Sequence, residues 1–429
     1  MSIQEQQDEQ EQVPTPTVTE RRFVEGGPGF ASGLRDLPKH LSISTVGAAV
    51  VAAIFGCTGP ALIIINGGEA NGLSAAQISS WIFGIYVFGG LISFVMALYY
   101  KMPITGAYSI PGAVLVVAAL KDYTFGEMVG AFIAAGVIVL VIGLTGLVQK
   151  VATWLPFPIV MAMIAGALIR FGVGVVDAAQ ALPVVVGAAI VGYLLLSRVI
   201  RTIPGVVGAL VFGSVAAAIT GSFSPLPGGL VLSAPELVAP SFSFGAILAV
   251  GVPLAILVIG AENTQAMGVL MVERYRPPFN SMTVISGVGG LVAALFGGHN
   301  ANIAGPMTAI CSSEQAGANK DGRYAASVVN GALFLLFGVF ASVAVGIVGT
   351  LPSELIAALA GLAMIGVLLQ AFQSSFGNAR FQVGALVALV VAMSGVTIFQ
   401  ISAPFWSLVA GVATTLILET KDLTLREES

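Results

Sequence analysis

The chain has 429 residues, of which 57% are hydrophobic and only 9% are charged, and its mean hydropathy is +0.97. A soluble domain carries about 25% charged residues, so this composition excludes an ordinary soluble protein and predicts an all-α polytopic membrane protein. The net charge is −4 and no basic cluster is present, which argues against a nucleic-acid partner. Cys57 and Cys311 lie in separate apolar runs, so we predict no disulfide framework, no metal cluster and no cofactor.

Residues 1–40 form a polar segment that is rich in Gln and Glu and then in Pro, Gly and Arg. Such a composition cannot bury a core, and no basic stretch leads directly into an apolar run, so the segment is neither a signal peptide nor a domain. We predict a largely disordered cytoplasmic tail, disordered up to about Phe30, with a short surface helix over Phe30–Leu41. Residues 420–429 are predicted to be a second cytoplasmic tail.

The rest of the chain is a succession of apolar runs. A helix needs about 20 residues to cross the hydrocarbon core of a bilayer, and on this length the runs divide into about 14 spans. In chain order the predicted spans are Leu41–Asn66, Ala75–Tyr99, Pro103–Leu120, Phe125–Val148, Pro156–Val173, Leu182–Ser197, Pro204–Thr220, Phe242–Met271, Asn280–Phe296, His299–Ser312, Tyr324–Val348, Pro352–Gln370, Phe381–Ile398 and Ala403–Leu418.

The positions of the basic residues give an independent test of these spans, because Lys and Arg collect in cytoplasmic loops. If the amino terminus is cytoplasmic, all of the 17 Lys and Arg residues except Lys121 and Arg170 fall on the cytoplasmic side. One missing or extra span would invert every later loop. The pattern therefore predicts the number of spans and places both termini on the cytoplasmic side. We expect the protein in the inner membrane of a bacterial cell.

The two halves of the chain carry an internal repeat. Leu155-Pro156 recurs as Leu351-Pro352, and Pro111 recurs as Pro306, at an offset of 195 or 196 residues. Seven predicted spans separate the equivalent positions, and an odd number reverses the direction of crossing. We therefore predict two inverted repeats of seven spans, an architecture in which transporters bind solute near the membrane midplane.

Spans 3 and 10 each contain a polar stretch followed by an apolar helix. Ile104–Ser109 precedes Pro111 in the first repeat, and His299–Ala304 precedes Gly305 and Pro306 in the second. Proline is tolerated in the first turn of a helix, where its missing N–H is not needed. Each span is therefore predicted to be a short extended segment plus a half-helix, and two half-helix amino termini would favour an anion between them.

Glu262 is the acidic residue that we place deep inside a span, in the run G-A-E-N-T-Q-A-M-G that starts at Gly260. Ionisable residues inside a membrane are costly and usually functional, so Glu262 is a candidate both for substrate binding and for carrying a proton. The alternative is a hydrogen-bonded glutamate that ties helices together. Asn263 and Gln265 either bind substrate or bridge helices.

The polar stretches of spans 3 and 10 supply the other candidates. His299 is either a second proton carrier or an interfacial residue. Asn300 and Asn302 would contact substrate or pair the extended segments, and Thr308 would face the cavity or bond to its own helix. In the first repeat the counterparts are Tyr108, whose ring could stack on an aromatic solute or simply pack, and Ser109. The predicted substrate-binding set is Tyr108, Ser109, Glu262, Asn263, Gln265, Asn300, Asn302 and Thr308.

Two runs together resemble the BenE family of benzoate:proton symporters: G-A-E-N-T-Q-A-M-G-V-L from Gly260 and G-G-H-N-A-N-I-A-G-P-M-T-A-I-C from Gly297. The resemblance extends from Leu34 to about Glu419. More distantly, the chain is similar to UraA-like nucleobase transporters and sulfate-permease-type anion transporters.

The wider resemblance implies a core domain of spans 1–4 and 8–11 (residues 41–150 and 242–350) and a gate domain of spans 5–7 and 12–14 (residues 151–241 and 351–419). It also implies elevator movement of the core against the gate, often within a homodimer. Glu262 matches the acidic residue in span 8 with which nucleobase transporters hold substrate, but their span 10 glutamate falls at or next to Ala301. The loss of that carboxylate favours an anionic substrate over a neutral base.

We therefore expect import of benzoate or a similar aromatic carboxylate together with a proton. The alternatives are a proton-independent anion exchanger or uniporter, or a transporter of another small organic anion or a nucleobase. An enzyme is not expected, since the sequence holds only two histidines and two cysteines and shows neither a Ser-His-Asp set nor an HExxH motif.

Overall fold

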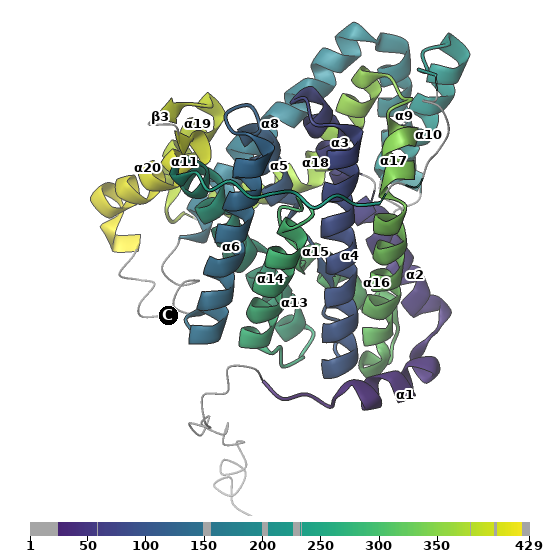
Figure 1. Cartoon of the computed structure of the whole chain (residues 1–429), viewed down its shortest axis with the longest axis vertical. Helices are drawn as coiled ribbons and strands as arrows, with labels where there is room; N and C mark the ends of the chain where they lie inside the picture. Colours follow the sequence, from purple (N-terminus) through teal and green to yellow (C-terminus); the bar gives the residue numbers. More distant parts are fainter. Residues whose placement is uncertain are drawn as a thin grey trace, which may run out of the picture.

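The computed structural model describes residues 25–422 apart from residues 58, 149–155, 200–204, 226–231, 233, 378 and 399–400, and most of the described chain is helical (Figure 1). The helices of the first half are α1 (Phe30–His40), α2 (Ile43–Cys57), α3 (Gly59–Ala70), α4 (Ala75–Tyr100), α5 (Ile110–Ala119), α6 (Phe125–Thr145), α8 (Phe157–Ala181), α9 (Pro183–Val199) and α10 (Gly205–Thr220).

The second half begins with one long interrupted helix, made of α11 (Phe244–Ala246), the π-helical segment η1 (Ile247–Gly251), α12 (Val252–Ile256), the π-helical segment η2 (Leu257–Asn263) and α13 (Thr264–Val272). It continues with α14 (Phe279–Ala294), α15 (Gly305–Ser312), the 3₁₀ turns η3 (Glu314–Ala316) and η4 (Lys320–Gly322), α16 (Tyr324–Val339), α17 (Ala341–Val348), α18 (Ser353–Phe376), α19 (Gln382–Ser394) and α20 (Ala403–Leu418). Four two-residue strands complete the fold: β1 (Gly106–Ala107), β2 (Asn302–Ile303), β3 (Thr397–Ile398) and β4 (Ile401–Ser402).

Each predicted span contains one helix or a run of consecutive helices. Within the described residues, 7 helices are long and apolar enough to cross a membrane, and further apolar helices of 10–17 residues lie between them. The long ones are Ile43–Ala70, Ala75–Tyr100, Phe125–Thr145, Phe157–Ala181, Phe244–Val272, Lys320–Val339 and Ser353–Phe376. The polytopic all-α class is thereby confirmed, and the number of crossings stays a prediction.

The helices pack in two sets. In the first set α4 lies along α16, α6 lies along α14, and α2 lies along α16. In the second set α8 lies along α18 and α19, α9 along α10, and α19 along α20. Small residues allow the closest crossings: a Cβ at Gly331 of α16 would lie 2.7 Å from the Gly90 carbonyl oxygen of α4. Glycine at such crossings lets helix backbones approach closely in lipid.

An extended segment connects one end of the helices of the first set. It follows residue 233 and reaches α11, and it crosses in front of α4 (Figure 1). The Ser80 hydroxyl donates to the Glu236 carbonyl at 2.8 Å, the Val238 amide donates to the Leu295 carbonyl at 2.9 Å, and the Ser241 amide donates to the Gly126 carbonyl at 2.8 Å. The segment therefore binds the ends of α4, α14 and α6 without regular secondary structure of its own.

A second segment, residues 25–40, crosses the opposite end of the same helices (Figure 1). The Glu25 carboxylate accepts hydrogen bonds from the Asn280 and Ser281 amides, both at 2.8 Å, and from the Ser281 hydroxyl, and so caps the start of α14. The Tyr324 hydroxyl donates to the Gly33 carbonyl at 2.8 Å. The helix predicted over Phe30–Leu41 is present as α1, but the expected disorder up to about Phe30 is wrong for residues 25–29, since Glu25 caps a helix. Residues 1–24 lie outside the described residues.

The ion pair of Asp36 with Lys101 holds α1 against the end of α4. The Lys101 ammonium donates to Asp36 at 2.8 Å, that of Lys39 donates at 3.3 Å, and these contacts lower the pKa of Asp36 from 3.8 to about 2. A carboxyl whose pKa is lowered in the folded state stabilises that state above its ordinary pKa, and the contribution is lost as the pH falls through the folded value. We therefore expect α1 to loosen between pH 4 and pH 2.

Pepsin cleavage within residues 30–40 measures this loosening at low pH. The rate at these residues should rise from pH 4 to pH 2 relative to a second pepsin site in the same protein. Asp36→Asn should be cleaved equally fast at both pH values, whereas Asp177→Asn, a change on the far end of α8, should behave as wild type. A pH dependence that persists in Asp36→Asn would assign the loosening to another group.

Candidate functional site

The two polar stretches meet as a pair of short antiparallel strands. β1 and β2 are antiparallel, with Gly106 opposite Ile303 and Ala107 opposite Asn302. The Ala304 amide adds a hydrogen bond to the Thr105 carbonyl at 2.9 Å. The strands interrupt helices of a membrane protein, where unpaired backbone N–H and C=O groups are costly. Pairing of the two strands with each other avoids this cost.

The half-helices α5 and α15 start directly after the strands. Ser109 is the N-cap of α5, and its hydroxyl accepts a hydrogen bond from the Gly112 amide. Pro111 and Pro306 occupy the first turns of α5 and α15. Proline suits this position because the amides of a first turn have no partner inside the helix. Both starts therefore present N–H groups that have no partner inside their own helix, together with the positive ends of the helix dipoles.

Glu262 lies between these two helix starts. The Gly305 amide of α15 donates to its Oε2 atom at 3.3 Å, and the Ser109 hydroxyl and the Ile110 amide of α5 also interact with the carboxyl group. The side chain sits on the π-helical segment η2 and is 5% exposed. Single π-turns inside α-helices frequently occur at functional sites. The carboxyl group of Glu262 thus occupies the place where the half-helices favour an anion.

A cavity of about 480 Å³ opens beside Glu262, between the first helix set and helices α8 and α18 of the second. Its polar lining groups are Glu262, Thr264, Gln265, Gln370 and Ser374, and the rest of the wall is apolar. The apolar lining residues are Phe55, Ile110, Pro111, Phe157, Met161, Ile164, Ala261, Pro306, Ala363 and Gly366. A largely apolar pocket with a few convergent polar groups is typical of small-molecule sites.

His299 lies behind this cavity, in a buried aromatic cluster. The indole N–H of Trp81 donates to its Nδ1 atom at 2.9 Å, and its Nε2 atom is 2.9 Å from the Ser109 carbonyl oxygen. An indole N–H can only donate, so Nδ1 must be the acceptor and the network assigns the proton to Nε2. His299 is thus held as a neutral tautomer that positions the backbone just before α5.

Three more predicted residues form hydrogen bonds that hold the paired strands in place. The Asn300 Oδ1 atom accepts from the Ser109 amide at 3.0 Å, Asn302 donates to the Ile303 carbonyl at 2.9 Å, and the Thr308 hydroxyl accepts from the Thr105 amide at 3.2 Å. Within the described part of the chain, Asn300 Nδ2 and Asn302 Oδ1 are buried without a hydrogen-bond partner.

Asn263 and Tyr108 also point away from the cavity. Asn263 accepts from the Ser286 hydroxyl at 3.1 Å and so ties η2 to α14. The Tyr108 hydroxyl donates to the Gly56 carbonyl at 2.8 Å and lies 2.7 Å from the hydroxyl of Tyr86. It therefore fastens the strand segment to the end of α2 and leaves no ring face for a solute in the cavity.

Of the predicted substrate-binding set, Glu262 and Gln265 line the cavity, together with the predicted half-helix residues Pro111 and Pro306. The structure places the other six behind it, where their contacts favour positioning roles: Tyr108, Ser109, Asn263, Asn300, Asn302 and Thr308. Gly305 contributes its backbone amide. No group of three or more His, Cys, Asp or Glu side chains in the described residues could hold a metal ion.

Sequence reasoning missed the wall that α8 and α18 supply. Phe157, Met161, Gln370 and Ser374 carry no motif, and nothing in an isolated apolar helix shows which face meets a cavity formed with residues on other helices. The recurrence of the Leu-Pro pair before both helices was the available signal, because it places α8 and α18 at equivalent positions of the repeat.

Comparison with known proteins identifies the family. The family profile described as BenE, benzoate membrane transport protein, matches residues 39–417. The "Benzoate membrane transport protein" of Acinetobacter baylyi is 28% identical over 385 residues, which cover 90% of this chain and 98% of that protein. The "Inner membrane protein YdcO" of Escherichia coli is 30% identical over 374 residues, which cover 87% and 95% of the two chains.

Two solved transporter structures have a similar fold. The transmembrane domain of the cyanobacterial bicarbonate transporter BicA superposes with a TM-score of 0.58 at 17% identity, over 86% of this chain and 97% of that one. Murine Slc26a9 in the inward-facing state gives 0.59 at 14% identity, over 98% and 75%. The fold and the family match over most of the chain agree: the protein is a membrane transport protein that belongs to the BenE family of benzoate membrane transport proteins.

Proposed function

We propose that this protein imports benzoate or a similar aromatic carboxylate together with one proton. The observation that carries the proposal is the position of Glu262, whose carboxyl group lies against the starts of both half-helices. An ionised Glu262 would hold that anion site itself and would repel a second carboxylate. A proton on Glu262 removes the repulsion and releases the helix amides for the substrate.

Binding would therefore begin with protonation of Glu262. The substrate carboxylate then takes hydrogen bonds from the Gly305 and Ile110 amides, and Gln265 is placed to donate a further one from the adjacent turn. The aromatic ring lies against Phe157 and Met161, since apolar surface gains free energy when it leaves water. With Glu262 protonated, the loaded site carries one negative charge, that of the substrate. With Glu262 ionised it would carry two, so the proton reduces the charge that must cross the membrane.

Movement of the two helix sets against each other would carry this site across. The residues that bind the carboxylate lie on η2, α5, α13 and α15, whereas Phe157, Gln370 and Ser374 lie on α8 and α18. Sliding of the first set as a core against the second set as a gate opens the cavity to one side at a time, as in an elevator. Core and gate in this proposal comprise residues 41–150 with 242–350, and 151–241 with 351–419.

The membrane location, the orientation and the oligomeric state are also part of the proposal. The distribution of Lys and Arg supports cytoplasmic termini in a bacterial inner membrane, and the resemblance to related transporters supports a homodimer. Labelling of single-cysteine variants from outside the cell tests the orientation.

Filling the cavity at Gly366 tests its assignment as the substrate site. A Cβ at Gly366 of α18 would meet no atom within 4 Å, and the residue lines the cavity, so the side chain of Gly366→Val would extend into the space for the ring. We expect KM for benzoate to rise about fivefold or more, because overpacking usually costs about 1–3 kcal/mol. The measurement is exchange of labelled benzoate in proteoliposomes at equal pH on both sides.

Gly174 on α8 provides the matched control. A Cβ there also meets nothing within 4 Å, but the residue does not line the cavity. Gly174→Val should keep the wild-type KM. If both variants exchange benzoate like wild type, the ring does not bind beside α18 and the assignment of the cavity is wrong.

A further inference from the structure

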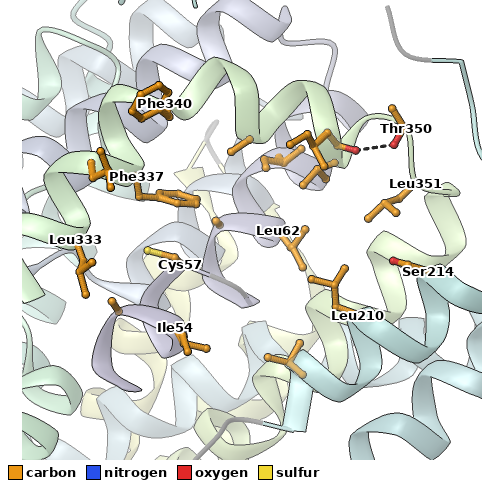
Figure 2. Close-up of a pocket in the computed structure, with 18 of the residues that line it drawn as sticks. Ile54, Cys57, Leu62, Leu210, Ser214, Leu333, Phe337, Phe340, Thr350 and Leu351 are labelled. Atoms are coloured by element: carbon orange, nitrogen blue, oxygen red, sulfur yellow. Dashed lines mark hydrogen bonds between the residues drawn. The ribbon is translucent and has the colours of Figure 1, made fainter. Parts of the chain in front are cut away.

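A second and larger cavity lies apart from the carboxylate site. It has a volume of about 800 Å³ and lies between α2, α3, α16 and α17 on one side and α10, Phe223 and the turn with Thr350 and Leu351 on the other. Figure 2 shows Ile54, Cys57 and Leu62 facing Leu210 and Ser214 across the open space, with Phe337 and Phe340 above. α2 separates the two cavities, because Ile54 lines this one and Phe55 lines the other.

The lining of this second cavity, which we call the groove, is apolar almost throughout. Among the described residues no charged side chain lines it, and the lining side chains that carry a heteroatom are Cys57, Ser214 and Thr350. The Thr350 hydroxyl already donates to the Ile347 carbonyl at 2.7 Å, a bond drawn in Figure 2. A polar ligand would lose its hydrogen bonds to water here at a cost of several kcal/mol, so the groove suits a hydrocarbon ligand.

The groove opens sideways at membrane depth. Leu336 and Ile347 at its edge are 57% and 50% exposed, and both lie on apolar helices of one predicted span. From Leu333 to Ile347 the wall is about 21 Å long at 1.5 Å per residue, which exceeds the depth of one leaflet, about 15 Å or half of the hydrocarbon core. The neighbour at this opening is therefore lipid, and the groove is long enough for one acyl chain.

We propose that an acyl chain of a bilayer phospholipid occupies this groove as a bound ligand. Protein interiors are packed like organic crystals, and lining atoms without partners lose their dispersion contacts. A flexible hydrocarbon chain restores these contacts and can adapt to an irregular wall. It also lies between the two helix sets, where it separates α10 from α2 and α16.

Photo-cross-linking tests the proposal without any transport measurement, so its failure is distinct from failure of the proposed function. The wild-type protein is reconstituted in phosphatidylethanolamine and phosphatidylglycerol with a small fraction of phospholipid that carries a diazirine in the acyl chain. After irradiation, peptide mass spectrometry should find several-fold more adducts at Leu210 and Leu333 than at Val137 and Val191, which are 46% and 50% exposed on outward helix faces. Equal labelling of all four would show ordinary bulk lipid and overturn the proposal.

Two variants fill the groove from opposite walls. Ala344→Phe on α17 and Ser214→Phe on α10 should lower the adducts at Leu210 and Leu333 to the level of the outward positions, whereas Val137→Phe on α6 should leave them unchanged. Gel filtration of each variant verifies folding, and the comparison of positions in the wild type stands if one variant fails to fold. Loss of the groove adducts on addition of benzoate, with labelling at Val137 retained, would assign the groove to the substrate and overturn the lipid proposal.

Discussion

Glu262→Gln is expected to exchange labelled benzoate across proteoliposomes at equal pH and to lose its response to a proton gradient. Glutamine is neutral like the protonated acid, so it neither repels a substrate carboxylate nor holds the Gly305 amide as strongly as the ionised Glu262 does. The anion site between the half-helices then stays available at every pH. Exchange by the variant should be independent of pH between 6 and 8, whereas wild-type exchange should slow as the pH rises and Glu262 ionises.

Glu354→Gln is the matched control for this prediction. Glu354 is a half-buried residue in the first turn of α18 and does not line the benzoate cavity, so its variant should keep the pH response of the wild type. If Glu262→Gln remains as sensitive to pH as the wild type, another group carries the proton. If it binds no benzoate at all, the carboxylate of Glu262 contacts substrate in a way that a neutral amide cannot replace.

His299→Leu is expected to destabilise the protein and to leave the pH response of transport in place. The change leaves the Trp81 N–H and the Ser109 carbonyl without their partner, and a buried polar group without a hydrogen bond costs about 1–3 kcal/mol. The start of α5 should also lose its anchor, which raises KM for benzoate. Thermal unfolding and the pH profile of exchange measure the two effects.

A double-mutant cycle with Trp81 separates the structural role of His299 from proton transport. In the His299→Leu background, Trp81→Phe removes the unpaired donor and should recover part of the stability. Recovery of stability with an unchanged pH profile supports a positioning role. A stable His299→Leu protein whose exchange no longer depends on pH would instead make His299 the proton carrier.

Much of the architecture was accessible from the sequence because local chemistry and repetition agree. Pro111 and Pro306 mark the starts of α5 and α15, since proline lacks the N–H that a later helix position requires. The polar stretches before them pair as β1 and β2 because both repeats need partners for an interrupted backbone at membrane depth.

The hydrogen-bond partners of the site residues could not be predicted from the sequence in the same way. Tyr108 and Asn263 have the chemistry of substrate ligands, yet their partners are Gly56 and Ser286, residues that come close only in the folded chain. The same holds for His299, whose tautomer depends on Trp81, 218 positions away. Side-chain direction within an apolar helix bundle follows from packing, and hydrophobic periodicity does not encode it when all faces are apolar.

The wall formed by α8 and α18 shows the limit most clearly. Gln370 and Ser374 face Glu262 across a cavity, although their helix is apolar and predicts only a span. Glu262 itself stood out because a carboxylate inside a membrane is costly wherever it points. Residues whose burial is costly are found from sequence, whereas residues that line a cavity by geometry alone are not.

Gradient-driven uptake of labelled benzoate by the wild-type protein tests the central claim most directly. Because undissociated benzoic acid crosses lipid unaided, the quantity to measure is the initial rate in proteoliposomes minus the rate in protein-free liposomes of the same lipid. An inward gradient of one pH unit supplies about 1.4 kcal/mol per proton, and the account predicts that this gradient raises the protein-dependent rate and that a protonophore abolishes the increase. A protein-dependent rate that is the same with and without the gradient would contradict proton symport.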